Sequence, residues 1–337
     1  MKILVTGGAG YIGRTVVSAL AEAGHTPVIL DSLVVGRPEF VEGQVFYHGD
    51  IADGAVLGRV FREHPDMDAV MHFAARIDVE ESTRLPSLYY TENLAKAQVL
   101  LQAALAAGVK RFLFSSTAAV YQAGRPGEGL REDSPLLPLS AYASSKLMFE
   151  RVMADICREY GAFGMALRYF NPVGADPAMR SGPFRPDPSH LLGKLTKLSA
   201  RGGGTFTING DDYETRDGTP MRDFIHVWDL AQAHLAALTY MMDSAQETGF
   251  EIMNVGSSVG VTVREFVDTF LEVSGSPLNV VVGARRPGDS AGAFADTTRA
   301  REILGWVPRL SLRQGIADAL AWERIWRTLA RQSNGAT

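Results

Sequence analysis

A glycine-rich stretch near the start of the chain constrains the fold more than any other feature. Residues 4–14 read LVTGGAGYIGR, and Gly7, Gly10 and Gly13 recur three residues apart. They follow an apolar run at residues 3–6, and a helix-like pattern begins at Tyr11. A tight glycine turn between a strand and a helix lets the backbone approach a pyrophosphate and directs the helix N-terminus at its charge. We therefore expect a dinucleotide-binding unit here, with a purely structural glycine turn as the plainer alternative.

The first half of the chain continues this alternation of strands and helices. Runs of strand length lie at residues 3–6, 26–30, 45–48, 69–73, 111–115 and 163–169, and amphipathic stretches lie at 11–23, 55–64, 87–107 and 141–160. Such alternation predicts an α/β fold, a doubly wound parallel sheet of the Rossmann type with helices on both faces. We expect this domain to span residues 1–170.

The second half has a different texture. Residues 171–189 are rich in Pro, Gly and Arg and predict a long loop. Helices are expected at 191–200, 227–242, 263–273 and 312–329, and strands at 205–208 and 252–255. Residues 171–337 should form a smaller mixed α/β domain, with segments near 226–256 returning to the first domain.

Composition excludes several classes of partner. The net charge of −5 argues against nucleic acid or an anionic membrane. No apolar run approaches the roughly 20 residues of a membrane span. Cys157 is the only cysteine, so no intramolecular disulfide can form, which suits a cytoplasmic location. The histidines show no metal-ligand spacing, and we expect no metal.

Further positions favour NAD as the dinucleotide. Asp31 ends the second strand, where its carboxylate can accept from the adenosine ribose hydroxyls and would repel the 2′-phosphate of NADP. Asp50 and Ile51 follow the third strand and could flank the adenine. Phe73, Ala74 and Ala75 end the fourth strand, at the edge where open α/β sheets bind ligands.

The stretch SAYASSK predicts a proton-transfer pair. Tyr142 and Lys146 are four residues apart and share one face of a helix. A nearby ammonium favours the phenolate and so lowers the pKa of a tyrosine from its usual value of about 10. Thr117, at the end of the fifth strand, can hydrogen-bond the substrate oxygen whose proton Tyr142 takes. We interpret Thr117, Tyr142 and Lys146 as the catalytic residues.

With these residues in place, the sequence resembles the UDP-hexose 4-epimerases of the extended short-chain dehydrogenase/reductase superfamily. The resemblance rests on VTGGAGYIG, HFAA, FSSTAAVY, YASSK, RYFNPVGA, RDFIHVWDLA and RRPGD. It implies that Tyr142 deprotonates the sugar 4-hydroxyl while C4 gives a hydride to NAD, and that the 4-keto sugar then rotates and takes the hydride back on its other face. In the related 4,6-dehydratases, acidic residues follow the threonine. Ala118 and Ala119 stand there in this chain and cannot transfer protons.

The resemblance to this family implies two sets of binding residues. The cofactor set is Gly7, Gly10, Tyr11, Ile12, Gly13, Asp31, Ser32, Asp50, Ile51, Phe73, Ala74, Ala75, Arg76, Asn93, Ser115, Tyr142, Lys146 and Tyr169. The UDP-sugar set is Thr117, Tyr142, Asn171, Arg180, Arg185, His190, Leu191, Thr207, Asn209, Arg222, Arg286 and Asp289. Thr207 and Asn209 are expected at the uracil, Arg222 and Arg286 at the diphosphate, and Asp289 at the uridine ribose. The resemblance also implies a homodimer in which residues 87–107 and 141–160 form a four-helix bundle.

One position departs from the family pattern at the cofactor. Family members often carry a lysine one position past Arg76, and this chain has Ile77 there. The contact of that lysine with the cofactor ribose is therefore lost unless Arg76 replaces it.

The identity of the sugar depends on two weaker features. Arg180 and Arg185 lie in the loop expected over the hexose, where a cation could pair with a C6 carboxylate. Ala293 stands where the family uses a bulky residue to narrow the hexose pocket, and a small one admits larger sugars. We expect UDP-glucuronate as the substrate, followed by UDP-glucose or UDP-galactose and then a UDP-N-acetylhexosamine. A nucleotide-sugar 4-reductase is the alternative enzyme class.

Overall fold

A seven-stranded parallel sheet organises the larger part of the molecule, which we describe from a computed structural model of residues 1–124, 127–244, 248–285 and 290–334. The strands are β1 (Lys2–Thr6), β2 (Thr26–Asp31), β3 (Val45–His48), β4 (Ala69–His72), β5 (Arg111–Ser115), β7 (Phe163–Tyr169) and β11 (Gly249–Val255). Their order is β11-β7-β5-β4-β1-β2-β3, and all neighbours are parallel. The strand order reverses between β1 and β4, the place where sheets of this kind bind ligands.

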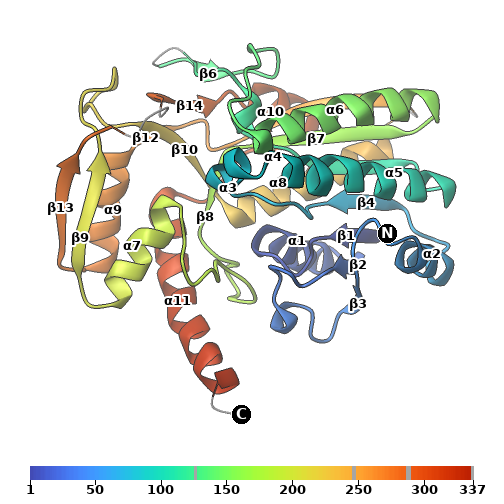
Figure 1. Ribbon diagram of the computed structural model, residues 1–337, viewed down its shortest axis with the longest axis horizontal. Coiled ribbons are helices and arrows are strands. Elements are labelled where there is room, and N and C mark those ends of the chain that lie inside the picture. Colours follow the sequence, from blue (N-terminus) through green and yellow to red (C-terminus); the bar gives the residue numbers. More distant parts are fainter. Residues whose placement is uncertain (125–126, 245–247, 286–289, 335–337) are drawn as a thin grey trace.

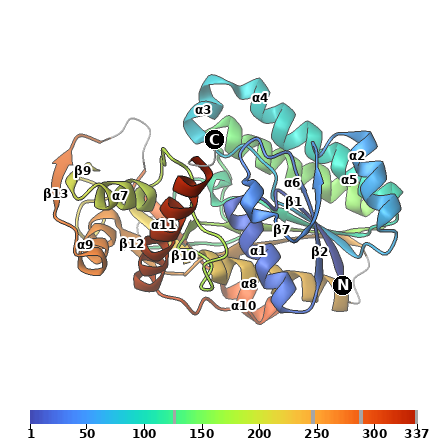
Figure 2. The ribbon, with the colours of Figure 1, turned by 90° about the horizontal axis from the view of Figure 1, so that it is seen from below.

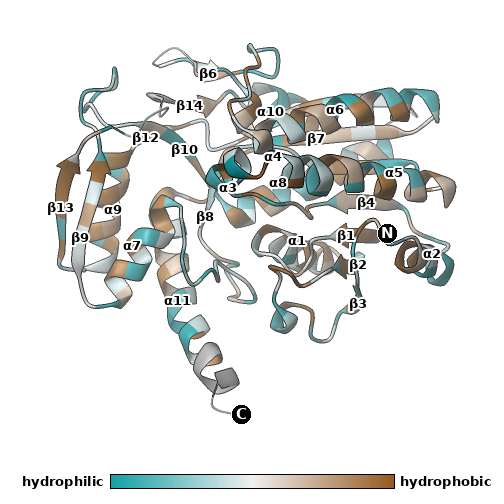
Figure 3. Cartoon of the chain, viewed as in Figure 1, coloured by the Kyte–Doolittle hydropathy of each residue, from teal (hydrophilic) through white to brown (hydrophobic). Residues whose placement is uncertain are grey.

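Helices cover both faces of the sheet (Figure 2). On one face lie α1 (Tyr11–Glu22) and α8 (Val227–Asp243), and on the other lie α2 (Gly54–Glu63), α5 (Lys96–Ala106) and α6 (Ala141–Glu159). Alternate strand residues point to opposite faces. Ile3 and Val5 therefore join the core beneath α1 and α8, and Leu4 joins the other core. Figure 3 shows the apolar character of the central strands, and the predicted doubly wound fold is confirmed.

The predicted helix 87–107 is interrupted in the structure. Short helices α3 (Val79–Arg84) and α4 (Pro86–Tyr90) precede a π-helical turn, η2 (Thr91–Ala95), and α5 follows it. The physical reason lies at Asn93, whose buried amide accepts a hydrogen bond from Arg76 N at 2.8 Å and donates one to Arg76 O at 3.0 Å. Apolar periodicity does not reveal this tertiary contact.

Among the described residues, the smaller part contains two small sheets together with the helices named below (Figure 1). One sheet has the order β12 (Gly260–Thr262), β10 (Met221–His226), β14 (Gly292–Ala295) and β6 (Gly129–Leu130), with β8 (Asn171–Val173) also paired to β10. The other pairs β9 (Gly204–Asn209) with β13 (Leu278–Gly283). The helices α7 (Leu191–Ala200), α9 (Val263–Ser274) and α11 (Leu312–Asn334) enclose a core that includes Phe206, Phe224 and Phe266.

Among the described residues, three elements from the second half of the chain belong to the large sheet and its cover. All seven residues of β11 pair with β7, and α8 packs on α1. The helix α10 (Thr298–Leu304) packs in turn on α8. In the described part of the chain, no helix is long and apolar enough to cross a membrane.

Candidate active site

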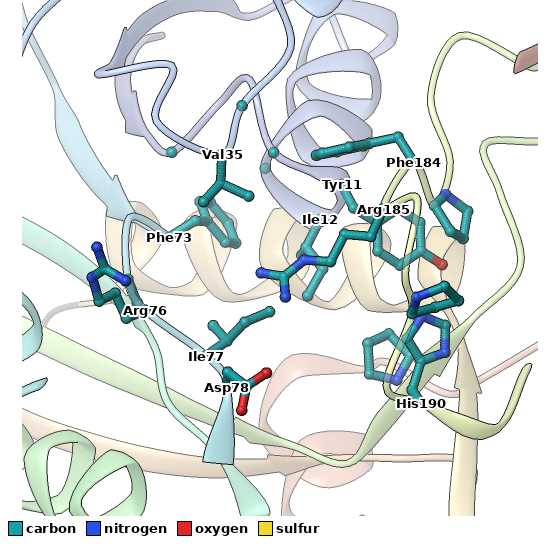
Figure 4. A pocket seen from close by; sticks show the side chains of 18 of the residues that line it. Tyr11, Ile12, Val35, Phe73, Arg76, Ile77, Asp78, Phe184, Arg185 and His190 are labelled. Carbon is teal, nitrogen blue, oxygen red and sulfur yellow. The ribbon is translucent and has the colours of Figure 1, made fainter. Parts of the chain in front are cut away.

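A cavity of about 1810 Å³ lies where the carboxyl ends of the parallel strands meet the smaller part of the molecule. Figure 4 shows that its walls come from both halves of the chain, with Tyr11 and Ile12 facing Arg185 and His190. Cavities that hold one drug-sized ligand usually measure roughly 300–1,000 Å³. This one has room for a dinucleotide together with a second ligand.

The structure brings nearly all predicted cofactor residues to this cavity. Its walls include Gly7, Gly10, Tyr11, Ile12, Gly13, Asp31, Ser32, Asp50, Ile51, Phe73, Ala74, Ala75, Arg76, Ser115, Tyr142, Lys146 and Tyr169. Asn93 is the exception, because it is buried behind the wall and holds the backbone of Arg76. Asn93 is placed as a positioning residue, and the described geometry gives no support to its direct contact with the cofactor.

The glycine loop fits a pyrophosphate because two of its glycines admit no side chain. A Cβ on Gly13 would lie 2.2 Å from Gly7 O, and one on Gly7, whose φ is 74°, would lie 2.6 Å from Ala74 N. A Cβ on Gly10 would approach Gly7 O no closer than 3.2 Å. Gly10 also lines the cavity, so a side chain there would occupy space meant for a ligand. The packing therefore requires Gly7 and Gly13, and the ligand requires Gly10.

The Asp31 carboxylate is fixed beside this loop. Its Oδ2 accepts from Ala9 N at 3.0 Å and its Oδ1 accepts from Leu33 N at 2.8 Å. Burial raises the pKa of Asp31, and the two backbone hydrogen bonds oppose that rise. Each oxygen keeps a further lone pair, so the group can still accept from ribose hydroxyls, as predicted.

Thr117 and Tyr142 meet at the centre of the cavity wall. Thr117 ends the strand region after β5 and caps the short helix η3 (Ala118–Val120), and Tyr142 lies in the first turn of α6. Burial raises the pKa of Tyr142, and its hydrogen bond with the Thr117 side chain opposes that rise. The two side chains lie next to each other on the cavity wall, which suits proton exchange with a substrate hydroxyl.

Lys146 lies one helical turn beyond Tyr142 and is 2% exposed. Its Nζ donates to Ser115 O at 2.9 Å and lies 4.8 Å from the centre of the Phe114 ring. Burial lowers the pKa of Lys146 to about 7, and the charge of Glu150 opposes this effect. The expected lowering of the Tyr142 pKa by the lysine is not seen, because burial dominates at both residues.

A buried ion pair behind Lys146 was not predicted. Glu150, one further turn along α6, binds Arg168 of β7 through two contacts of 3.0 and 2.6 Å. Arg168 also donates to the Tyr121 hydroxyl at 3.0 Å, and Ser116 donates to Glu150. The spacing of Tyr142, Lys146 and Glu150 places all three on one helix face, and this signal could have revealed Glu150.

Four predicted substrate residues form the opposite side of the cavity wall. They are Asn171, Arg185, His190 and Arg222. Asn171 is oriented by the hydrogen bond from its Nδ2 to Asp223 O at 2.9 Å. The His190 side chain caps α7 by accepting from Gly193 N at 3.1 Å. Arg286 and Asp289 lie outside the described residues.

The structure gives no support to the predicted contact between Arg180 and the sugar. Its Nε donates to Asp176 at 2.6 Å, a second nitrogen contacts Glu22 at 2.7 Å, and the guanidinium lies 5.4 Å from the Trp228 ring. Asp176 is fully buried, and the contacts of Arg180 with Asp176, with Glu22 of α1 and with Trp228 of α8 direct its side chain toward these two helices. The arginine does not line the cavity.

Four other positions also lie away from the described cavity wall. Leu191 packs in the core of the smaller part, and its neighbour Leu192 lines the cavity instead. Thr207 and Asn209 lie on β9, where the alternate residues Phe206 and Ile208 face the core, so their predicted contact with uracil has no support in this geometry. Ala293 packs against a small apolar cluster beside β6.

Comparison with known proteins agrees with this site. Residues 3–256 match the model of the NAD dependent epimerase/dehydratase family.

The chain belongs to this family.

Among its relatives, the UDP-glucose 4-epimerase of Azospirillum brasilense is 44% identical over 326 residues, which cover 96% of this chain and 92% of the relative. The UDP-glucose 4-epimerase of Streptococcus mutans is 42% identical, with 96% of each chain covered. Among solved structures, UDP-glucose-4-epimerase from Stenotrophomonas maltophila with bound NAD and formylated UDP-arabinopyranose superposes with a TM-score of 0.91 at 35% identity, covering 98% of this chain and 99% of that one. The enzyme from Bifidobacterium longum in complex with NAD+ and UDP gives 0.88 at 33% identity, covering 96% and 98%.

The family includes both epimerases and dehydratases, and the residues after Thr117 separate the two chemistries in this chain. Ala118 is partly buried and packs against the apolar cluster beside β6, and Ala119 is exposed. Neither carries an ionisable group. The described residues also contain no group of three or more His, Cys, Asp or Glu side chains placed to hold a metal ion.

Several cavity residues were missed by sequence reasoning. Lys96 lines the wall and binds Asp50 at 2.6 Å and Glu92 at 2.8 Å. It therefore fixes the residue expected beside the adenine. Arg37 and Phe184 also line the wall, from the loop after β2 and the loop after β8. Such contacts between distant loops leave no periodic signal in a sequence.

Proposed function

We propose that this protein is a UDP-glucose 4-epimerase, which uses NAD to interconvert UDP-glucose and UDP-galactose. The observation that carries the proposal is the position of Tyr142, Thr117 and Lys146. They lie in one continuous cavity that joins the glycine loop to the substrate-side residues Asn171 and Arg222. The relatives at 42–44% identity bear the same activity in their names.

The residues divide the reaction between them. When bound, NAD would supply the hydride acceptor in the first half of the cycle and the hydride donor in the second half of the same cycle. Tyr142 takes the proton of the 4-hydroxyl, with Thr117 holding the same oxygen, and the C4–H bond is broken as a hydride to give a 4-keto sugar. When the sugar has turned its other face, the hydride returns to C4 and Tyr142 returns the proton to the oxygen. Atoms and electrons balance over the cycle, so only the configuration of C4 changes.

The neutral hexose replaces the glucuronate that we expected from the sequence. That expectation rested on Arg180 and Arg185. The ion pairs with Asp176 and Glu22 hold Arg180 away from the cavity, whereas Arg185 lines it. The names of the relatives favour the neutral hexose. Ala293 does not line the cavity wall, so it gives no ground for a larger sugar.

The test is to incubate the enzyme separately with UDP-glucose, UDP-glucuronate and UDP-N-acetylglucosamine and to record the C4 epimer by NMR. We expect UDP-galactose from UDP-glucose, and no activity in the matched variant Tyr142→Phe, which lacks only the phenolic oxygen. Epimerisation of UDP-glucuronate in preference to UDP-glucose would restore the uronate assignment. A net change in nicotinamide absorbance without an epimer would show a reductase instead.

A homodimer and a cytoplasmic location belong to the same proposal. Apolar side chains on one helical layer are exposed: Leu85 at the start of α4 is 49% exposed, Val99 of α5 is 40% exposed and Met148 of α6 is 43% exposed. Packing of α5 and α6 against a second copy would cover them. We expect a mass of two chains by light scattering and a single chain for the variant Val99→Glu/Met148→Glu. A wild-type mass of one chain would rule the dimer out.

A further inference from the structure

One charged side chain in the cavity has no described partner. Arg185 lines the wall from the loop after β8, and it makes no hydrogen bond or ion pair with any residue that the structure describes. In Figure 4 its side chain extends into the cavity, and its guanidinium lies between Ile12 and Ile77. An arginine that crosses a binding cavity without a partner is suited to an anionic ligand, because its planar fork binds phosphate oxygens in pairs.

The backbone that carries Arg185 is held rigidly. Trp322 Nε1 donates to Pro183 O at 2.8 Å, and a Cβ on Gly182 would lie 2.4 Å from the Trp322 ring. Phe184 is buried, with its ring centre 5.4 Å from that of Phe40 and 5.2 Å from the guanidinium carbon of Arg37. Pro186 follows Arg185 and keeps its backbone extended. The loop is thus ordered before any ligand arrives, which reduces the entropic cost of a contact.

The glycine loop opposite Arg185 presents backbone groups to a phosphate but no cation. Residues 7–13 at the N-terminus of α1 carry no charged side chain, and Ile77, which is 52% exposed, adds only apolar surface. Arg76, the expected substitute, contacts Glu81 at 3.2 Å, and Figure 4 shows it pointing away from Arg185. The glycine loop itself therefore supplies no cation to a pyrophosphate. Arg37, which lines the cavity from the same half of the chain, lies against the rings of Phe184 and Trp326, with its guanidinium carbon 5.2 and 5.5 Å from their centres.

We propose that Arg185 binds the pyrophosphate of the dinucleotide from the substrate side of the cavity. The inference rests on the proposed use of NAD and not on the identity of the sugar. In this arrangement Phe184 packs the loop 182–186 against the segment after Asp31. Arg185 then contacts the cofactor from the side opposite the glycine loop. The cofactor is then held by both halves of the chain, which suits an enzyme that regenerates NAD in each cycle and has no need to release it.

The experiment measures how fast resident NAD+ in the holoenzyme exchanges with isotopically labelled NAD+. A contact between a guanidinium and a phosphate is worth about a tenfold change in binding, so we expect exchange about tenfold faster in Arg185→Gln. The matched control is Lys197→Gln, which also removes a cation from the cavity wall. Because Lys197 is already paired with Asp187 at 2.6 Å, we expect this variant to exchange its NAD+ at the wild-type rate. Calorimetry with UDP alone should give the same affinity for both variants and the wild type.

A rescue variant locates the charge. In Ile77→Lys/Arg185→Gln a cation returns from the opposite wall, and we expect exchange to slow again to within about threefold of the wild type. Wild-type exchange in Arg185→Gln, or loss of UDP affinity with unchanged NAD exchange, would overturn the inference and leave the proposed function intact. Wild-type protein that holds no NAD would overturn the proposed function as well.

Discussion

Removing Arg168 tests how much of the site depends on the buried ion pair behind the catalytic lysine. Arg168 and Glu150 are each 2% exposed, and the guanidinium meets the carboxylate through two contacts of 3.0 and 2.6 Å. In Arg168→Met the carboxylate of Glu150 stays buried and keeps only the Ser116 hydroxyl as a donor. Losing one partner of such a pair costs about 3–5 kcal/mol. This is a large share of the roughly 5–15 kcal/mol that stabilises a typical domain.

The assay is urea unfolding followed by circular dichroism at one fixed NAD concentration. The double variant Arg168→Met/Glu150→Gln removes both charges, and we expect it to recover most of the stability that Arg168→Met loses. The control Arg158→Met breaks an exposed pair with Asp155 and should leave the unfolding midpoint unchanged.

The pKa of Lys146 gives a second, independent test of the ion pair. Because the charge of Glu150 raises the pKa of Lys146 while burial lowers it, Glu150→Gln should move that pKa below its value of about 7. The account would be refuted if Arg168→Met lost less than about 1 kcal/mol, or if the double variant were as unstable as the sum of the two single variants.

Three further predictions follow from the site. Gly10→Ala should fold normally but weaken NAD binding on the order of tenfold, measured by calorimetry. Gly13→Ala should lose about 1–3 kcal/mol of unfolding free energy, measured by urea unfolding. The reverse pattern would contradict the loop geometry. In nucleotide-free protein, Lys146→Met should be inactive yet more stable at pH 7, because burial lowers the pKa of the native lysine to about 7 while the unfolded chain keeps its proton up to about 10.5. The unfolding free energy of the wild type therefore rises between pH 7 and about 10.5, and the stability advantage of Lys146→Met should shrink over this range. A stability difference that stays constant with pH would contradict the lowered pKa of Lys146. Arg180→Ala should lose about 1–3 kcal/mol, because it leaves Asp176 buried without its partner, with no change in the KM for UDP-glucose; a raised KM would return Arg180 to the substrate site.

Sequence patterns predicted the large sheet because its physics is local and repetitive. Strands β3, β5 and β7 have the predicted bounds. β5 and β7 are buried along almost their whole length, whereas β3 lies at the edge of the sheet with Val45 and His48 exposed. The glycine loop was equally predictable, because a backbone that must approach both itself and a ligand admits few residue types.

The remaining strands depend on partners that are far away in the sequence. β8 contains Pro172 and β10 contains Arg222 and Asp223, so neither resembles a strand until the two are paired. The Asp223 carboxylate accepts from Ser257 N at 2.7 Å and Ala295 N at 3.0 Å, and this explains a charged residue in a buried strand. No periodicity encodes such contacts.

The two loop arginines show the same limit at the site itself. Both arginines of the loop 171–189 were expected over the sugar, and they are five positions apart in the sequence. The buried Asp176 turns Arg180 outward, and the packing of Phe184 under Trp322 and Trp326 leaves Arg185 facing the cavity. Tertiary partners, and not the residue type, decide which cation can meet a ligand.

The central claim is that this chain inverts C4 by moving one hydride between the sugar and resident NAD. The most direct test uses UDP-glucose deuterated at C4 in ordinary water, with the product examined by NMR and mass spectrometry. The account predicts UDP-galactose that keeps its deuterium at C4, no net change in nicotinamide absorbance, and no product from Tyr142→Phe. Loss of the deuterium to solvent during epimerisation, or an unimpaired Tyr142→Phe variant, would contradict it.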